Sequence, residues 1–239
     1  MSETAKSGFI TEDQVVNEFE NWQTSLHAMT WLSRITKEKI NTVTAKTTRS
    51  IGRNSKADVI VTINGKDSGI SIKKFTANFN QIDKRWIDNY VKLWDIPQDV
   101  GDTLRKYCGV SGFRPMDHGI TSRDTRRYFL DEVTDNERDN LVGFFQKNNV
   151  RIINDVLCGA DSLHADFLLV IRKDGNNIAE SHMAIMENVL KHYNGDVTIT
   201  KRGNLKMGKI TIQRKGGNGG GPTAQMLQFK FSPKGAFEL

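Results

Sequence analysis

The amino-acid sequence predicts an α/β fold in which helices flank a mixed β-sheet. Apolar residues recur at helical spacing between residues 11 and 34, and again from 81 to 94. Between these stretches, and again near the C-terminus, apolar and polar residues alternate as they do in half-buried strands. Helical and strand-like segments therefore interleave along the chain, which favours one sheet covered by helices.

The stretch 11–34 is expected to form one or two helices. Thr11 suits an N-cap, acidic residues follow it in the first turn, and Val15, Phe19 and Trp22 share one apolar stripe. We expect this stripe to pack against the sheet.

Residues 57–75 are expected to form a β-hairpin. The segment 57–63 is rich in β-branched side chains, and Asn64-Gly65 follows it as the strongest short-range signal for a two-residue turn. Alternation resumes over 69–75, which supplies the second strand.

The rest of the chain adds further helices and strands. A helix is expected from Gln81 to Trp94, with Pro97 as a stop, and residues 98–150 are expected to be mostly helical. The remaining expected elements are a helix at 181–193 and strands at 150–153, 167–171, 197–200, 209–214 and 226–231.

The composition is that of a soluble globular protein. The 239 residues are 37% hydrophobic and 26% charged, and no Pro/Ser-rich linker divides them, so we expect a single domain over residues 1–239. The sequence shows no apolar run of membrane-spanning length and no signal peptide, which predicts a cytoplasmic protein. Cys108 and Cys158 lack metal-ligand spacing and are expected to be buried thiols.

Positive charge is concentrated near the C-terminus. From Val197 to Phe237 there is no aspartate or glutamate, whereas the chain as a whole has a net charge of +6. The basic residues of this segment are Lys201, Arg202, Lys206, Lys209, Arg214, Lys215, Lys230 and Lys234. Because the rest of the chain is slightly acidic, this local basicity predicts a face that meets a polyanion, with nucleic acid as the first candidate.

DNA recognition is expected over about 197–234, where an alternating strand ends in Gln213-Arg214-Lys215 before a glycine-rich loop. Such an element can enter the major groove, where Arg214 or Lys215 would contact guanine. Gln213 or Gln228 would contact bases or phosphates. The side chains expected to add phosphate or other DNA contacts are Lys201, Arg202, Lys206, Lys209 and Lys230. The alternative is a generic solubilising basic face.

The predicted hairpin brings an acid beside a lysine. A two-residue turn places Asp58 opposite Ser71, whereas a four-residue loop places it opposite Lys73. In either register Asp58 lies about 5 to 8 Å from Ser71 and Lys73, which share one face of their strand.

This arrangement suits metal-dependent hydrolysis of a phosphodiester. The Asp58 carboxylate and a strand carbonyl such as that of Ile72 are oxygen ligands of the kind that Mg²⁺ prefers. Lys73 would orient or deprotonate the attacking water and offset negative charge that builds up on the phosphate. The pattern is a degenerate form of the PD-(D/E)xK nuclease site. The alternative is an exposed hairpin with ordinary surface charges.

Ser71 leaves this candidate site one oxygen short. Nucleases with this pattern usually carry a second acid or an amide at that position, and a hydroxyl is a weaker Mg²⁺ ligand than a carboxylate. Glu18 or Glu20 would supply the missing ligand if the N-terminal helix packs over the hairpin. Otherwise each is a solvated helix charge.

Several longer stretches share a common order with a known family. They are Phe19-Glu20-Asn21-Trp22, Phe79-Asn80-Gln81-Ile82-Asp83-Lys84-Arg85-Trp86, Val189-Leu190-x-His192-Tyr193, Arg202 to Gly208, Thr211-Ile212-Gln213-Arg214-Lys215-Gly216-Gly217 and Met226-Leu227-Gln228-Phe229-Lys230. Together they resemble the type II restriction endonucleases of the HinP type, which cut within GCGC. An ordered set of this kind is more specific than any single motif.

The resemblance implies a restriction-endonuclease-like fold and Mg²⁺-dependent, sequence-specific hydrolysis of double-stranded DNA at a short G/C-rich site, with GCGC as the candidate. It implies that Asp58 is the metal-binding acid and Lys73 the catalytic lysine. Ser71 departs from the family pattern because it stands where the HinP type has glutamine.

The resemblance also implies where DNA is contacted. The stretch Phe79-Asn80-Gln81 follows the active-site strand and would approach DNA near the cut, and Gln213-Arg214-Lys215 would read bases. The protein would act as a monomer or homodimer beside a DNA methyltransferase that it does not contact. Two other functions remain open, a non-catalytic DNA-binding module and a structure-directed DNA repair nickase.

Overall fold

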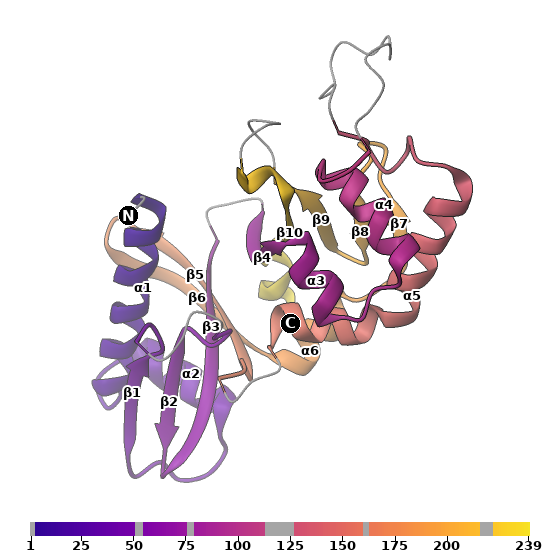
Figure 1. The fold of residues 1–239 in the computed structure, drawn as a ribbon. Helices are drawn as coiled ribbons and strands as arrows, with labels where there is room; N and C mark the ends of the chain where they lie inside the picture. The colour runs from indigo at the N-terminus through magenta and orange to yellow at the C-terminus, as the bar shows by residue number, and fades with distance from the viewer. Residues whose placement is uncertain (1–2, 51–54, 76–78, 113–126, 160–162, 216–221) are drawn as a thin grey trace. The chain divides into compact units, whose positions relative to one another are not determined.

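The computed structural model describes residues 3–50, 55–75, 79–112, 127–159, 163–215 and 222–239, and the chain divides into two compact units (Figure 1). The first unit comprises Met1–Asn80, Leu157–His192 and Ser232–Leu239, and the second comprises Gln81–Val156 and Tyr193–Phe231. Each unit is therefore assembled from segments that are far apart in the sequence. One domain over residues 1–239 stays a prediction.

The first unit is built on a five-stranded sheet with the order β1-β2-β3-β5-β6. Its strands are β1 (Val43–Thr47), β2 (Val59–Ile63), β3 (Lys66–Lys74), β5 (Phe167–Asp174) and β6 (Asn177–Ile185). The pairing of β3 with β5 is parallel and the other pairings are antiparallel. The sheet is thus mixed, which confirms the α/β prediction.

The hairpin of β2 and β3 takes the two-residue turn. Asn64 and Gly65 have φ values of 48° and 82°, a backbone conformation that Asn and Gly tolerate best. Ile63 pairs with Lys66 and Val59 pairs with Ile70. The alternative four-residue loop is therefore excluded. Just beyond the last pair, the Asp58 amide donates to the Ile70 carbonyl at 2.8 Å, and the Asp58 side chain lies within 3.3 Å of the Ser71 hydroxyl.

Helices α1 (Glu3–Glu20) and α2 (Leu26–Ile35) belong to the first unit. Val15 and Phe19 of α1 are fully buried and share a core with Val59 and Val61 of β2, so α1 lies along the sheet as expected (Figure 1). The expected start of the helix at Thr11 was wrong. Thr11 lies inside α1, where its hydroxyl is satisfied by the carbonyl of Ser7 at 3.0 Å.

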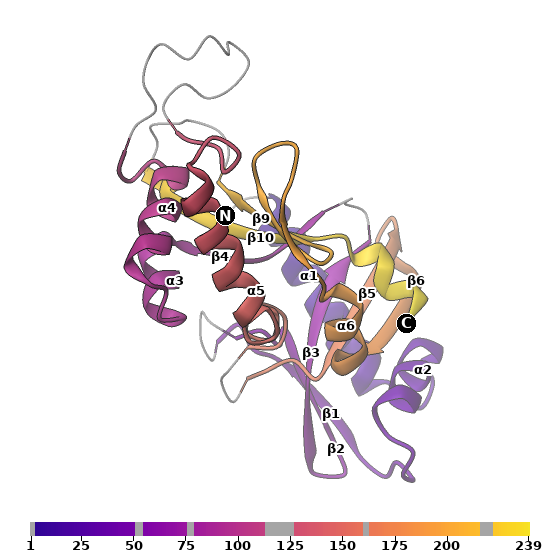
Figure 2. The same ribbon diagram turned by 90° about the vertical axis from the view of Figure 1, so that its right-hand side faces the viewer.

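The second unit contains a second five-stranded sheet, with the order β4-β10-β9-β8-β7. Its strands are β4 (Asn80–Trp86), β7 (Val197–Ile199), β8 (Leu205–Met207), β9 (Ile210–Arg214) and β10 (Met226–Phe231). Helices α3 (Ile87–Leu93), α4 (Gln98–Cys108) and α5 (Asp135–Leu157) lie beside this sheet (Figure 2). The 3₁₀ turn Pro222–Gln225 also belongs to this unit. The 3₁₀ turn Pro233–Glu238 and all of α6 (Met186–Tyr193) except its last residue belong to the first unit. The expected start of this helix at residue 181 was wrong, because residues 181–185 pair with β5 as part of β6.

Two expected elements of the second unit were wrong. The segment expected as a helix from Gln81 to Trp94 is strand β4 followed by α3. Its apolar residues fit helical spacing, but the first half also alternates as in a strand, and pairing with β10 stabilises the strand. The segment 150–153, expected as a strand, lies within α5, where Ile152 and Ile153 are both buried. A short β-branched run does not by itself distinguish a strand from a buried helix.

Aromatic packing fixes the helices of the second unit on the sheet. The rings of Tyr90 and Trp94 lie 5.4 Å and 5.5 Å from the ring of Phe229 on β10. The Trp94 indole also donates to Asp155 on α5 at 2.9 Å. Tyr90, Trp94 and Phe229 are at most 2% exposed, so they form the centre of this core.

The two cysteines are free and buried, as expected. Burial raises the pKa of the Cys108 thiol to about 12, so it remains a protonated core side chain at neutral pH.

Among the helices in the described ranges, none combines the length and the apolarity needed to cross a membrane.

Candidate active site and nucleic-acid interface

The start of β2 and the middle of β3 bring Asp58, Ser71 and Lys73 together. The Asp58 carboxylate accepts from the Ile72 amide at 2.6 Å and from the Ser71 hydroxyl at 3.3 Å. The Lys73 ammonium lies 3.5 Å from the same carboxylate oxygen. It also donates to the Ser71 hydroxyl and to the Ile72 carbonyl, each at 3.0 Å. The acid, hydroxyl, lysine and strand carbonyl therefore form one hydrogen-bonded cluster.

The pleat of β3 explains this cluster. Ile70 is fully buried in the core of the first unit and Ile72 packs against that core, so the alternate residues Ser71 and Lys73 lie on the other face. The side chains of Lys73 and Asp58 are 18% and 29% exposed. They are thus held in a partly desolvated setting where charge–charge interactions are stronger than in water.

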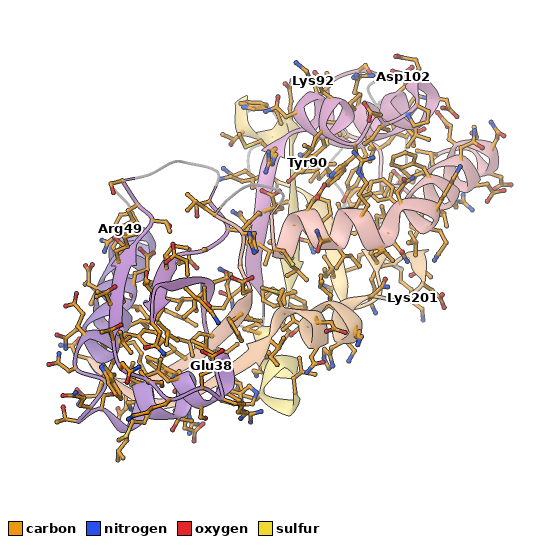
Figure 3. All side chains as sticks on the ribbon, turned by 90° about the horizontal axis from the view of Figure 1, so that it is seen from below. Glu38, Arg49, Tyr90, Lys92, Asp102 and Lys201 are labelled. Carbon is orange, nitrogen blue, oxygen red and sulfur yellow. The ribbon has the colours of Figure 1, made fainter. Side chains whose placement is uncertain are left out.

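A second carboxylate, Glu12, reaches this site from α1. Burial raises the pKa of Glu12, and the neighbouring Asp58 carboxylate raises it further, while Arg49 and Lys73 act in the opposite direction. Arg49 Nε lies 3.1 Å from Glu12 Oε2, and the guanidinium also pairs with Asp13. Figure 3 labels Arg49 beside α1. The Arg49 contact lacks hydrogen-bond geometry, and the buried Oε2 has no hydrogen-bond partner in the structure.

The glutamates expected to complete the site lie elsewhere. Glu20 is the exposed last residue of α1, eight positions beyond Glu12, which is about 12 Å along a helix axis. Glu18 is hydrogen-bonded to the hydroxyl of Ser25, the N-cap of α2. The carboxylate of α1 that interacts electrostatically with Asp58 is therefore Glu12. From the sequence, Glu12 was expected only as an acidic residue in the first turn of the helix.

The donor set fits a hard divalent cation. The donor set consists of two carboxylates, a hydroxyl and a backbone carbonyl, so every donor atom is an oxygen. The Glu12 Oε2 atom accepts no hydrogen bond from the described residues and can therefore coordinate a cation. Within the described ranges, no group of three or more His, Cys, Asp or Glu side chains forms a site for a metal ion. Two carboxylates with open positions left for substrate and water are the usual Mg²⁺ arrangement.

The sheet of the second unit has a polar, basic face. Lys206 pairs with Thr211, and Thr211 pairs with Lys230, so the three side chains form a row across β8, β9 and β10. Gln213 and Gln228 form the next pair of the same face. Gln228, expected to contact DNA, is only 8% exposed, and its side chain donates to the Arg214 carbonyl at 3.5 Å. We call these five residues the basic face; Ile210 and Ile212 alternate with them and are buried on the opposite side.

Other basic residues lie in the turns beside this face. Lys201 and Arg202 are exposed in the turn between β7 and β8, where Figure 3 labels Lys201. Lys209 is exposed in the turn between β8 and β9. Lys215 follows β9, and its amide continues the pairing with β10 by donating to the Met226 carbonyl at 2.8 Å.

Arg214 is placed differently from the base-reading position expected for it. It shares strand parity with Ile210 and Ile212, lies on the inner face of the sheet and is 7% exposed. Its guanidinium donates to the carbonyl of Tyr107 at 3.0 Å and to that of Tyr128. The outward positions at this strand end are Gln213 and Lys215.

The side chains of residues 79–81, which follow β3, are only partly buried. Phe79 is 59% exposed, Gln81 is exposed, and Asn80 donates to the Lys74 carbonyl at 3.0 Å. Trp86, the last residue of β4, is 38% exposed. Phe79 and Gln81 are therefore available for a ligand.

Comparison with known families identifies the family of the chain. The model of the R.HinP1I restriction endonuclease family matches residues 51–237. The chain belongs to the R.HinP1I restriction endonuclease family. The matched range includes Asp58, Ser71, Lys73 and the whole basic face, and the family makes the chain a type II site-specific deoxyribonuclease.

The fold of this family member is similar to that of restriction endonuclease MspI, whose crystal structure contains its cognate DNA. The two structures superpose with a TM-score of 0.62 at 13% sequence identity, over 92% of this chain and 87% of MspI. At this identity the similarity shows the restriction-endonuclease fold. None of the curated proteins matches the chain.

Proposed function

We propose that the protein hydrolyses double-stranded DNA in a Mg²⁺-dependent reaction at a short G/C-rich sequence, with GCGC as the candidate site. The observation that supports this most directly is the cluster of Asp58, Ser71 and Lys73 with the Glu12 carboxylate beside it. The cluster provides oxygen ligands for a metal ion and a lysine for the attacking water within one small region.

Asp58, Glu12 and the Ile72 carbonyl would hold the ion. Mg²⁺ would supply Lewis-acid activation of the scissile phosphate and of the attacking water. The Ile72 amide and the Ser71 hydroxyl, which donate to Asp58, orient its carboxylate. Glu20 is omitted from this ligand set because α1 carries it away from Asp58.

Lys73 would hold the attacking water and offset charge in the transition state. Its ammonium is fixed by two acceptors at 3.0 Å, the Ser71 hydroxyl and the Ile72 carbonyl. A lysine fixed in this way does not have to be reorganised as negative charge builds up on the phosphate. Ser71 thus acts through Lys73 and Asp58, and it is a weaker metal ligand than the glutamine that stands there in the HinP type.

DNA would lie against the basic face of the second unit. Lys206 and Lys230 would bind phosphates, together with Lys201, Arg202 and Lys209 in the adjacent turns. Gln213 and Lys215 have outward or edge positions from which bases can be read. The buried Gln228 would support this strand end through its bond to the Arg214 carbonyl and would not contact bases. Phe79, Asn80 and Gln81 would approach the DNA near the cut. The complex of MspI with its cognate DNA supports duplex DNA as the ligand class.

The biological setting would be cytoplasmic restriction, with a separate DNA methyltransferase that protects host DNA without contacting this protein. The nuclease would act as a monomer or homodimer.

The deciding experiment is digestion of unmethylated phage DNA by the purified protein in Mg²⁺, followed by sequencing of the fragment ends. Discrete fragments that share one short motif would support the proposal and give the recognition site. Intact DNA that is still bound in a gel shift would favour a non-catalytic binding module. Nicks that require a mismatch would favour a repair nickase.

A further inference from the structure

Two buried arginines bind each other's neighbouring backbone in the second unit. Arg127 is 4% exposed, and its guanidinium donates to the Lys215 carbonyl at 3.1 Å and to the Ala224 carbonyl at 3.3 Å. Lys215 follows the last residue of β9, and Ala224 lies in the 3₁₀ turn before β10. Arg127 thus binds the backbone on both sides of residues 216–221.

Arg214 makes the reciprocal contacts. Its guanidinium donates to the carbonyl of Tyr128, the residue after Arg127, and to that of Tyr107 near the end of α4. The guanidinium carbon lies 4.1 Å from the centre of the Phe129 ring and 5.1 Å from that of Tyr107. Arg127-Tyr128 and Arg214-Lys215 therefore bind one another through side chain and carbonyl, and we call this pair the arginine clasp.

Tyr107 extends the clasp to the turn before β8. Its hydroxyl accepts from the Arg214 amide at 3.2 Å and donates to Asn204 at 2.6 Å. The backbone of Arg214 and its side chain are thus both fixed by one tyrosine. The end of β9 is therefore bound by Arg127, Tyr107 and Tyr128.

The clasp is a costly way to fill a core. Removing a guanidinium from water carries a large desolvation penalty, and apolar side chains of similar volume often stabilise a protein as well or better. A guanidinium fork, however, fixes two carbonyls at once in a defined geometry. The clasp is therefore better suited to setting a backbone position than to adding stability.

The backbone that it sets carries the outward side chains Gln213 and Lys215. In a strand these alternate with Arg214, so the inward clasp and the outward side chains are rigidly coupled. Discrimination of base edges requires donors and acceptors placed within about 0.5 Å of the productive geometry. Attraction to phosphates does not depend on such accuracy.

We propose that Arg127 and Arg214 are positioning residues for sequence discrimination, because they fix the backbone from which Gln213 and Lys215 meet the bases. The proposal rests on the proposed function. Loss of the clasp loosens the register of these two side chains without removing any cation from the basic face. Discrimination between sequences falls, and attraction to DNA in general does not.

The test uses Arg127→Lys and Arg214→Lys, which keep the positive charge but lose the fork. Affinity is measured for a duplex that contains the recognition site and for one with a single changed base pair, in Ca²⁺ to prevent cleavage. We expect the ratio of the two affinities to fall by about tenfold in each variant, while affinity for unrelated DNA changes by less than about threefold. The double variant is expected to lose no more than either single one, since the clasp acts as a unit.

Arg105→Lys is the matched control, because Arg105 lies on α4 of the same unit, where it pairs with Asp88 and Asp102. A destabilised fold lowers the melting temperature and the active fraction but leaves the affinity ratio of the folded molecules intact. A ratio in both clasp variants equal to that of the wild type and the control would overturn the proposal. If Arg214→Lys fails to fold, Arg127→Lys alone decides. A wild-type protein without sequence preference would instead refute the proposed function.

Discussion

The two units use charge in opposite ways. In the first unit, opposite charges interlock in a partly buried cluster, where Lys73 lies 3.5 Å from Asp58 and Arg49 lies 3.1 Å from Glu12. In the second unit, residues 197–231 carry no acidic side chain. The lysines of this segment lie on outward strand positions, in exposed turns or, for Lys215, directly after β9.

This difference reflects what each surface has to do. Hydrolysis of a phosphodiester depends on a few groups in fixed positions, so the loss of one group is severe. Attraction of a polyanion depends on the summed field, so the loss of one cation is mild. The buried arginines of the second unit differ from its lysines. Their guanidinium groups are fixed by backbone carbonyls and, as in the first unit, depend on exact position.

The largest effect is expected for Lys73→Ala. The cleavage rate should fall by at least about 100-fold, because the variant loses the group that holds the attacking water and offsets transition-state charge. Binding of the site in Ca²⁺ should change little. Lys66→Ala is the control, since Lys66 lies on the same strand but pairs with Glu38 at the far end of the hairpin. Cleavage that persists in Lys73→Ala would remove this lysine from the mechanism.

Glu12→Gln should weaken binding of divalent metal by roughly 10- to 100-fold, the range typical of changes around a metal site. The physical reason is the loss of one of two carboxylates near the ion. Titration of Mn²⁺ followed by electron paramagnetic resonance measures the affinity without any turnover. Glu20→Gln, on the same helix, should bind Mn²⁺ as the wild type does. The reverse pattern would show that α1 presents its other end to the site.

A smaller effect is expected for Lys206→Ala and Lys230→Ala. Each should weaken binding to all DNA sequences alike and reduce the slope of log affinity against log salt by about 1, because one phosphate contact is lost. Filter binding over a salt series measures both quantities. A change that depends on sequence would instead assign the lysine to base reading.

The smallest expected effect is on stability, and its pH dependence should have opposite signs in the two units. Burial and Asp58 raise the pKa of Glu12, so its contribution to stability is present at low pH. That contribution is lost as pH rises from the ordinary value of about 4.3 through the raised pKa. For Glu137 on α5, burial acts to raise the pKa, but hydrogen bonds from Lys106 and Thr134 outweigh it and lower the pKa. Its contribution is therefore present above about pH 4.3 and lost as pH falls through the lowered pKa.

Urea unfolding of Glu12→Gln and Glu137→Gln between pH 3 and 8 measures these contributions. Above its pKa, Glu137→Gln should cost up to about 1 kcal/mol, since the amide keeps the capping-box contact with Thr134 but loses the charge that pairs with Lys106. Glu12→Gln should become relatively more stable than the wild type as pH rises. The same sign for both variants would contradict the electrostatic difference between the sites.

The candidate catalytic cluster could be predicted from the sequence because one local signal controls it. Asn64-Gly65 specifies a two-residue turn, the turn specifies the register, and the register sets Asp58 against Ser71. Every step depends on residues close together in the chain. The mixed α/β architecture was confirmed for the same kind of reason, since its strand and helix periods are local.

Glu12 was missed because its role depends on where α1 docks. A helix charge becomes a site residue only when packing brings it to a distant strand. Because α1 begins at Glu3, Glu12 lies in the middle of the helix and not in its first turn. Arg214 was different, since parity with Ile210 and Ile212 already placed it inward. The prediction gave more weight to the positive charge of Arg214 than to its strand position. The carbonyls of Tyr107 and Tyr128, which offset the desolvation cost of its guanidinium, lie about a hundred residues away in the sequence.

The parallel pairing of β3 with β5 has a consequence for biosynthesis. Lys73 lies opposite Val170, so β3 gains its second neighbour only when the ribosome has added about 100 more residues, which takes roughly 5 to 20 s. Until then β3 is an open sheet edge, whose unpaired backbone groups can pair with another chain. The growing chain therefore passes through an interval in which this strand is exposed to misassembly.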